Sequence, residues 1–417
     1  MHKRDELPPW PVVRRALAQT THRLAQEVAA PAAHAPAWNE FEWRIAMAVS
    51  VMHGVSGLLA GRLRWQGPAA WQAFLEEQLE QSRRREARAR GLLRALDTEA
   101  RLAGVPLLGL KGSALLALGL YAPGERPMSD VDLLVHPEHQ DRADAVIRST
   151  GYLLGIDSSR HRAYEPPGLG LARAFGEHES NPTKIELHVE IQERLPVRQV
   201  DITGELMPLR SAAGLQGYAS AGALMRHLLL HTAGNVCNRC VRLIQLHDIA
   251  VLGAELDDAD WQVALAPTTD GRPAWWAAPP LTLAVRLFPR QLDAQKIQRP
   301  LQTAQAACPA ALRRSLPNRS LSADSLSHLD TPMLPGIEWS QSAPEALAFA
   351  WRRLRPPRDQ RMTQRAVVQR EAPLVASAWM HLPRWRKALS FVLGAPPRAQ
   401  TVYHLHHALT YRPSSSA

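Results

Sequence analysis

The sequence has few cysteines, few lysines and no long hydrophobic run. Its 417 residues include three cysteines, too few for the disulfide framework of a small secreted domain. No uncharged apolar stretch reaches the roughly eighteen residues of a membrane-spanning helix. The N-terminal residues 1–6 are not followed by the apolar stretch of a signal peptide. These absences predict a cytoplasmic protein without a transmembrane segment.

Two of the cysteines, Cys237 and Cys240, have the spacing of a zinc half-site or a redox pair. A zinc site needs a second pair of ligands, and Cys308 with scattered histidines supplies it poorly. His227 and His231 are spaced to share one helix face, but no glutamate follows His227 as in zinc proteases. Packing residues are therefore the favoured interpretation of both pairs.

The positive charge of the chain is almost entirely arginine. The formal net charge is +10, which favours anionic partners such as nucleotides, nucleic acid or lipid headgroups. The arginine-rich run at 83–90 lies within a predicted helix, and a basic segment at 381–393 contains two tryptophan-flanking arginines. A solvated or packed helix is the favoured interpretation of each, with nucleic-acid or membrane-surface contact as the alternative.

Helical patterns flank a central segment that alternates between strands and helices. We predict helices over 38–103, broken at 66–68, and again from 222 onward, including 222–231 and 239–252. Between them the pattern predicts three strands and two helices: strands 105–110, 130–135 and 184–192, and helices 114–120 and 139–149. Alternation of this kind within about ninety residues is typical of an α/β or α+β core.

Two aspartates begin the second predicted strand. Side chains alternate along a strand, so Asp130 and Asp132 share one face while Val131 and Leu133 point to the core. Their Cα atoms would lie roughly 6–7 Å apart, and each carboxylate disfavours ionisation of the other unless a cation lies between them. Mg²⁺ or Mn²⁺ takes such oxygen ligands. The alternative is a pair of exposed aspartates at a strand start.

The third predicted strand supplies further polar side chains on one face. Glu186, His188 and Glu190 alternate with apolar residues from Ile185 to Ile191. If this strand pairs with the aspartate strand, either Glu186 or Glu190 becomes a third carboxylate, and His188 and Glu190 are candidates for substrate contact. Three carboxylates on adjacent strands can hold two metals for in-line displacement at phosphorus.

The turn after the first predicted strand has residues suited to phosphate. Gly112 allows close backbone approach, Ser113 can donate a hydrogen bond, and a helix follows. Lys111 and Arg126 are candidate charge partners of a triphosphate. A Gly-Ser pair before a helix is on its own more often an ordinary N-cap.

The order of these motifs resembles the uncharacterised nucleotidyltransferase family within the DNA polymerase β-like superfamily. The similarity covers roughly residues 38–265 and is carried by Leu110-Lys111-Gly112, Tyr121–Arg126, Asp130–Val135, Gly151-Tyr152, Ile185–His188 and the helical segment 224–252, with His231, Arg242 and Asp248. The spacing from Ser113 to Asp130 is longer than in the short Gly-Ser motif of the superfamily.

This resemblance implies an α+β fold, with a polymerase-β-like core of mixed sheet and helices between helical N-terminal and C-terminal regions. The expected organisation is a helical region at 1–103, the nucleotidyltransferase core at 104–200, a packed helical region at 201–307, a loop or linker at 308–341 and a basic C-terminal region at 342–417.

The resemblance also implies an enzyme that transfers an NMP group from an NTP, such as ATP, to an acceptor hydroxyl. Asp130, Asp132 and Glu186 are then the catalytic, Mg²⁺- or Mn²⁺-binding residues. The acceptor is a small molecule, peptide, protein or RNA. The alternative is a catalytically silent regulatory protein of the same fold, antitoxin-like, that binds nucleotide or nucleic acid.

Overall fold

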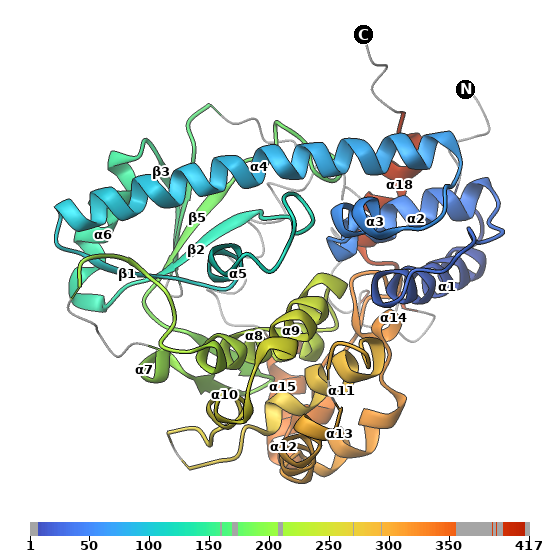
Figure 1. Cartoon of the computed structure of the whole chain (residues 1–417). Coiled ribbons are helices and arrows are strands. Elements are labelled where there is room, and N and C mark those ends of the chain that lie inside the picture. The colour runs from blue at the N-terminus through green and yellow to red at the C-terminus, as the bar shows by residue number, and fades with distance from the viewer. Residues whose placement is uncertain are drawn as a thin grey trace.

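The structure is a computed structural model that describes residues 7–158, 161–168, 174–206, 212–269, 271–292, 294–355, 386, 389 and 395–412. It is a mixed α+β fold, as predicted, with a six-stranded sheet set among helices (Figure 1). The order of strands across the sheet is β3-β4-β5-β2-β1-β8. Their bounds are β1 Pro106–Gly109, β2 Asp130–Leu134, β3 Leu153–Asp157, β4 His161–Glu165, β5 Lys184–His188 and β8 Gly214–Gln216.

Two parallel pairs lie within this otherwise antiparallel sheet. β2 pairs in parallel with β5 and β1 with β8, whereas β1–β2, β3–β4 and β4–β5 are antiparallel. The sequence predicted β1, β2 and β5 because each has buried apolar residues at regular spacing. It did not predict β3, β4 and β8, since β3 is half exposed at an edge and β8 has three residues.

Helices cover one face of the sheet. The long helix α4 (Ala69–Leu102) crosses in front of the strands in Figure 1, with α6 (Gln140–Ser149) at its end. These helices share a core with the apolar side chains of the central strands, among them Val131, Leu133, Ile185 and Leu187. Since side chains alternate along a strand, the polar residues of β2 and β5 point to the opposite face.

The larger core joins the N-terminal helices to the helices that follow the sheet. The N-terminal helices are α1 (Trp10–Ala29), α2 (Glu40–His53) and α3 (Ser56–Arg62), and α5 (Gly112–Leu118) follows β1. After α7 (Thr203–Leu206) come α8 (Ala221–Cys237), α9 (Leu243–Glu255), α10 (Asp258–Ala264), α11 (Ala278–Leu287) and α12 (Ala294–Ala306). Both α8 and α9 are buried over most of their length. In Figure 1 they lie below the sheet.

Strand β5 ends earlier than the sequence predicted, at His188 rather than at residue 192. The final ladder bond runs from the Val135 amide to the His188 carbonyl, at 3.0 Å. Beyond it, the Ile191 amide donates to Thr203 Oγ1. The chain then enters a separate hairpin of β6 (Gln192–Leu195) and β7 (Arg198–Asp201).

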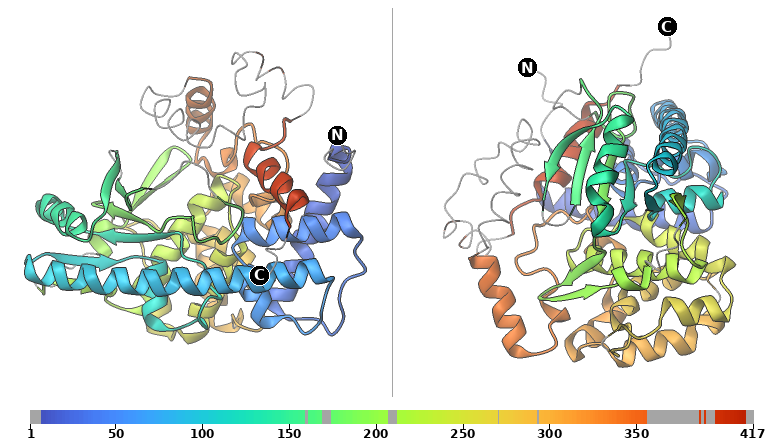
Figure 2. Two further views of the ribbon diagram at one scale, coloured as in Figure 1. Left: turned by 90° about the horizontal axis from the view of Figure 1, so that it is seen from above. Right: turned by 90° about the vertical axis from the view of Figure 1, so that its left-hand side faces the viewer.

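The segment 308–341, expected to be a loop or linker, contains the short helices α13 (Ala310–Ser315) and α14 (Leu321–Asp324) and buries Trp339 completely. Helix α15 (Ala343–Leu354) follows, and α18 (Ala399–Thr410) packs beside α2 (Figure 2). The basic segment at 381–393 falls almost entirely outside the described residues.

Among the residues that the structure describes, no single helix is both long and apolar enough to cross a membrane. Helices α2 and α3 taken together are long and apolar enough, but the chain bends by 114° at their junction.

Candidate active site

The two aspartates of β2 and the glutamate of β5 lie on the sheet face opposite α4 and α6. The parallel register places Asp132 directly beside Glu186, and Asp130 beside Lys184. Lys184 Nζ forms an ion pair with Glu165 at 2.7 Å. The strand ladder therefore brings together carboxylates that are 54 positions apart in the chain.

An acidic cluster, which we define as Asp132, Glu186 and His188, has ligand atoms close enough together that it could hold a metal ion. One ligand atom of each residue lies within 4.8 Å of the other two. His188 Nε2 is 3.2 Å from Asp132 Oδ1 and 3.6 Å from Glu186 Oε2. Asp130 flanks the cluster and accepts a hydrogen bond from the Ser129 hydroxyl at 2.9 Å.

Lys111 reaches the same carboxylate from the turn after β1. Its Nζ lies 3.2 Å from Asp132 Oδ1. Its backbone has a φ of 41°, a conformation that non-glycine residues rarely adopt and that concentrates at functional sites. The Lys111 amide donates to the Tyr218 hydroxyl at 3.2 Å, and that hydroxyl bonds to His227 Nδ1 at 2.7 Å. Tyr218 and His227 therefore stabilise the strained turn.

The pKa values of the two aspartates are shifted in opposite directions. Burial, reinforced by Asp132 and Glu186, raises the pKa of Asp130 to about 6. Burial alone would also raise the pKa of Asp132, but Lys111 and His188 outweigh it and hold that pKa well below its usual range. Asp132 is therefore ionised at neutral pH, with two cationic partners.

The same carboxylates shift the pKa values of the two cationic side chains, Lys111 and His188. Burial alone would lower the pKa values of Lys111 and His188, but Asp132 and Glu186 reverse that effect and raise both. The hydrogen bond from His188 lowers the pKa of Glu186. The charged forms of all four residues are thus mutually stabilised.

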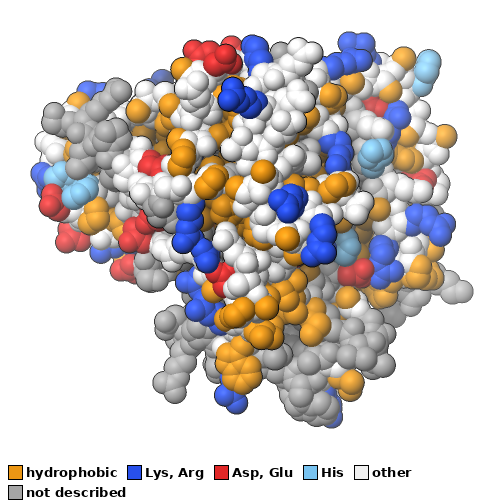
Figure 3. All heavy atoms as spheres, turned by 90° about the horizontal axis from the view of Figure 1, so that it is seen from below, with side chains coloured by type: hydrophobic (Ala, Val, Ile, Leu, Met, Phe, Trp, Pro, Cys, Tyr) orange, Lys and Arg blue, Asp and Glu red, His pale blue; other side chains and the backbone are white. Residues whose placement is uncertain are grey.

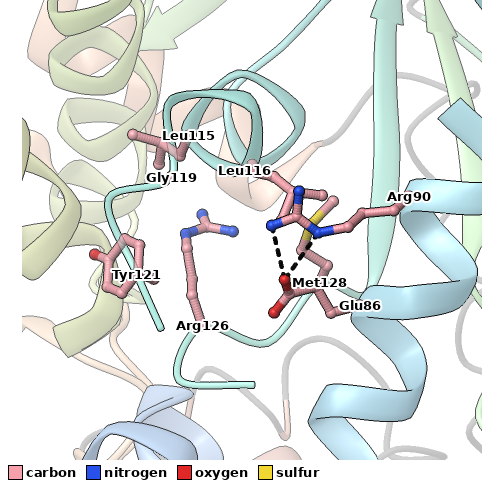
Figure 4. Close-up of a pocket in the computed structure, with 9 residues that line it drawn as sticks. Glu86, Arg90, Leu115, Leu116, Gly119, Tyr121, Arg126 and Met128 are labelled. Carbon is pink, nitrogen blue, oxygen red and sulfur yellow. Dashed lines mark hydrogen bonds and ion pairs between the residues drawn. The ribbon is translucent and has the colours of Figure 1, made fainter. Parts of the chain in front are cut away.

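Arg126 approaches from the loop after α5 and is anchored on α9. Its Nε and Nη2 donate to the two oxygens of Asp248, each at 2.8 Å. Together with Gly112, Tyr121, Met128, Leu115 and other residues, it lines a pocket beside α5. Figure 4 shows Arg126 between Tyr121 and the Glu86–Arg90 ion pair, with its guanidinium directed toward α5.

Two other candidate residues lie apart from these groups. Ser113 is 5% exposed, and its hydroxyl has no hydrogen-bond partner among the described residues. Glu190 lies beyond the end of β5, is exposed and accepts a hydrogen bond from Gln192. Glu186, and not Glu190, is the glutamate beside Asp132.

The sequence did not single out His161, which lies on β4 near the site. Its ring is 5.3 Å from that of His188, and its Nε2 is 4.0 Å from Glu186 Oε2. His231 on α8, one of the residues that carry the family resemblance, has its Nδ1 3.5 Å from Glu193 Oε1. No local pattern marks His161, because it arrives from a separate strand.

Cys237 and Cys240 form no disulfide bond with each other and do not belong to the acidic cluster. Burial raises the pKa of the Cys237 thiol well above its usual range and that of Cys240 to about 11. The thiolate forms needed for metal or redox chemistry are therefore disfavoured.

Comparison with known proteins gives one match. The model of a family described as uncharacterised nucleotidyltransferase matches residues 39–289, more than half of the chain. The match runs from α2 to α11 and includes every site residue described above. Searches among curated proteins and among solved structures found no match.

Proposed function

Because this chain belongs to the uncharacterised nucleotidyltransferase family and is therefore a nucleotidyltransferase, we propose that it transfers an NMP group from an NTP to an acceptor hydroxyl with the help of Mg²⁺ or Mn²⁺. The observation that carries this proposal is the acidic cluster with Asp130 beside it. The acceptor is a small molecule, peptide, protein or RNA, and the site residues do not distinguish among them.

The donor atoms of the site fit a divalent cation. Carboxylate oxygens are the ligands that Mg²⁺ and Mn²⁺ prefer, and here two carboxylates and an imidazole converge within 4.8 Å. Asp130, Asp132 and Glu186 would hold the cation, and the His188 nitrogen lies within the same group. When bound, the cation supplies positive charge against the triphosphate and the attacking oxygen.

The turn after β1 and the loop after α5 provide the protein's own positive charges. Lys111 and Arg126 bind the triphosphate in this proposal, and Gly112 leaves room for it. Ser113 packs beneath the turn in the described conformation, since its hydroxyl is enclosed. During transfer the acceptor hydroxyl loses its proton, its oxygen bonds to the α-phosphorus, and pyrophosphate leaves.

Thermal stability in the presence of each NTP tests the proposal. We expect the wild type to be stabilised by one or more NTPs only when Mg²⁺ or Mn²⁺ is present. A ligand at about a hundred times its dissociation constant adds roughly 2.7 kcal/mol to the free energy of unfolding. The double variant Asp130→Asn/Asp132→Asn should lose this metal-dependent gain, because it removes two anionic oxygen donors.

A matched double variant controls for the loss of charge. Asp141 and Asp258 are exposed residues in the first turns of α6 and α10, so Asp141→Asn/Asp258→Asn should keep the full nucleotide effect. Equal stabilisation of the Asp130/Asp132 variant, or no stabilisation of the wild type by any NTP, would contradict the proposal. Radiolabelled NTP then identifies the acceptor that receives the label.

A further inference from the structure

We propose that Asp248 on α9 is a positioning residue, which holds Arg126 so that the free edge of its guanidinium faces the triphosphate. The inference rests on the proposed function and adds to it a residue outside the sheet. Asp248 touches neither the acidic cluster nor the turn after β1, and acts through Arg126.

The contacts of Asp248 fix the plane of the guanidinium. Nε and Nη2 of Arg126 form two parallel bonds to the carboxylate, a geometry that restricts rotation more than a single bond does. The Tyr121 hydroxyl donates a third bond to Asp248 Oδ1 at 2.7 Å. Asp248 is 2% exposed, so the pair is shielded from water.

A second layer of hydrogen bonds supports Tyr121. Because Tyr121 donates its proton to Asp248, its oxygen accepts from His247 Nδ1 at 2.9 Å, and Arg62 donates to His247 Nε2 at 3.0 Å. This arrangement requires a neutral His247, and burial indeed lowers its pKa to about 3. Each side chain in this series of hydrogen bonds, which begins at Arg62 and ends at Arg126, therefore has a defined role as donor or acceptor.

The remaining nitrogen of Arg126 lies against the turn after β1. Nη1 has no hydrogen-bond partner within the described part of the chain, and a Cβ added at Gly112 would lie 2.8 Å from it. Gly112 thus gives Nη1 access to the turn, next to Lys111. Arg126 also lines the pocket of Figure 4, and its side chain remains 16% exposed.

Asp248 also keeps Arg126 away from a competing partner. Asp132 is near enough to help raise the pKa of Arg126. A guanidinium released from Asp248 would turn toward the acidic cluster, where it would neutralise carboxylates that the cation needs. The bidentate pair therefore directs Arg126 to phosphate and leaves Asp132 to the metal.

Two single substitutions test this inference without removing Arg126. Gly112→Ala displaces Nη1 and leaves the Asp248 pair in place, and alanine suits the first turn of a helix. Asp248→Asn removes the negative charge and one acceptor. Each should weaken binding of the preferred Mg²⁺–NTP by about tenfold, the effect of losing one charge-assisted bond. Gly91→Ala on α4, where nothing lies within 4 Å of the added Cβ, is the control.

The decisive measurement is the ratio of dissociation constants for the NTP and for its monophosphate, obtained by equilibrium dialysis of ATP, GTP, CTP and UTP with Mg²⁺. Gly112→Ala and Asp248→Asn should raise this ratio, because Arg126 acts on the phosphates and its loss increases the dissociation constant of the NTP more than that of the monophosphate. A purely structural role would weaken both nucleotides alike. An unchanged ratio in Asp248→Asn would overturn the inference, whatever the effect of Gly112→Ala.

A double variant guards against misfolding. Arg126→Met/Asp248→Asn removes both partners of the buried pair, which is less disruptive than leaving either charge alone. If Asp248 acts through Arg126, this variant should bind NTP no more weakly than Arg126→Met alone, and additive losses would overturn the inference. Failure of the wild type to bind any NTP would instead contradict the proposed function.

Discussion

At the scale of single residues, Lys111 forms an ion pair with the same Asp132 oxygen that the proposed cation would use. Its ammonium and the His188 ring each lie 3.2 Å from the same oxygen of Asp132. A cation that binds to Asp132 must therefore compete with the ammonium. A triphosphate offers Lys111 an alternative partner, so the metal and the nucleotide should assist each other's binding.

Lys111→Met should bind Mn²⁺ more tightly than the wild type when nucleotide is absent, by roughly tenfold, because a competing charge a few ångströms away is removed. The same variant should bind NTP more weakly. Mn²⁺ binding measured by electron paramagnetic resonance checks the first effect. Lys296→Met, at an exposed position of α12, should change neither; weaker Mn²⁺ binding by Lys111→Met would rule out competition.

At the scale of elements, local patterns predicted the strands that carry the carboxylates and the helices α8 and α9 that follow the sheet, but not which of their side chains meet at the site. The alternation around Asp132 and Glu186 follows directly from one buried and one polar sheet face. Tyr218 lies 107 positions after its partner Lys111, and Asp248 lies 122 positions after its partner Arg126, so both pairs are set by how the chain packs after the sheet. Nothing in the sequence near Arg126 specifies Asp248 as its partner.

His53 of α2 connects the start of α9 to the segment that follows α14 through a single neutral ring. Its Nδ1 accepts a hydrogen bond from the Leu243 amide at the start of α9, at 3.0 Å, and its Nε2 lies 3.1 Å from the Ser327 hydroxyl. A proton on Nδ1 would oppose the Leu243 amide. Burial, together with Arg242, lowers the pKa of His53 to about 3.

Stability should therefore fall as the solution is acidified. The unfolded histidine takes up a proton near pH 6.5 and the folded one does not, so the contribution is complete above pH 6.5 and is lost toward pH 3. Between pH 6.5 and 5 the loss from this ring is about 2 kcal/mol, measurable by urea unfolding. His53→Asn, which keeps an acceptor for Leu243, should show a shallower slope; an identical slope would exclude His53 as a cause.

At the scale of the whole molecule, the C-terminal helix joins the N-terminal helices instead of extending away from them. Arg44 of α2 donates to the carbonyl of Tyr411 at 2.7 Å, and the Tyr411 ring meets Phe74 of α4 edge to face at 5.3 Å.

On the face seen in Figure 3, the arginine and lysine side chains are spread between hydrophobic ones. The described residues of this face do not form one continuous basic surface.

Leu405 tests whether α18 unfolds together with the rest of the protein. The residue is fully buried, so Leu405→Ala should lower the free energy of unfolding by about 2–5 kcal/mol. Urea unfolding followed by tryptophan fluorescence and by circular dichroism should give one coincident transition. Leu347→Ala, at a position 71% exposed, should have little effect, and an equally small effect at Leu405 would mean that α18 unfolds independently.

The backbone of Lys111 also has an evolutionary consequence. With a φ of 41°, this position would be occupied by glycine at lower free energy, by about 1 kcal/mol or more. The ion pair with Asp132 opposes that exchange, so glycine becomes the more stable residue only once Asp132 has also been replaced. If Lys111 binds the triphosphate as proposed, glycine at this position together with a lost Asp132 is the pattern expected in a descendant that no longer transfers nucleotides.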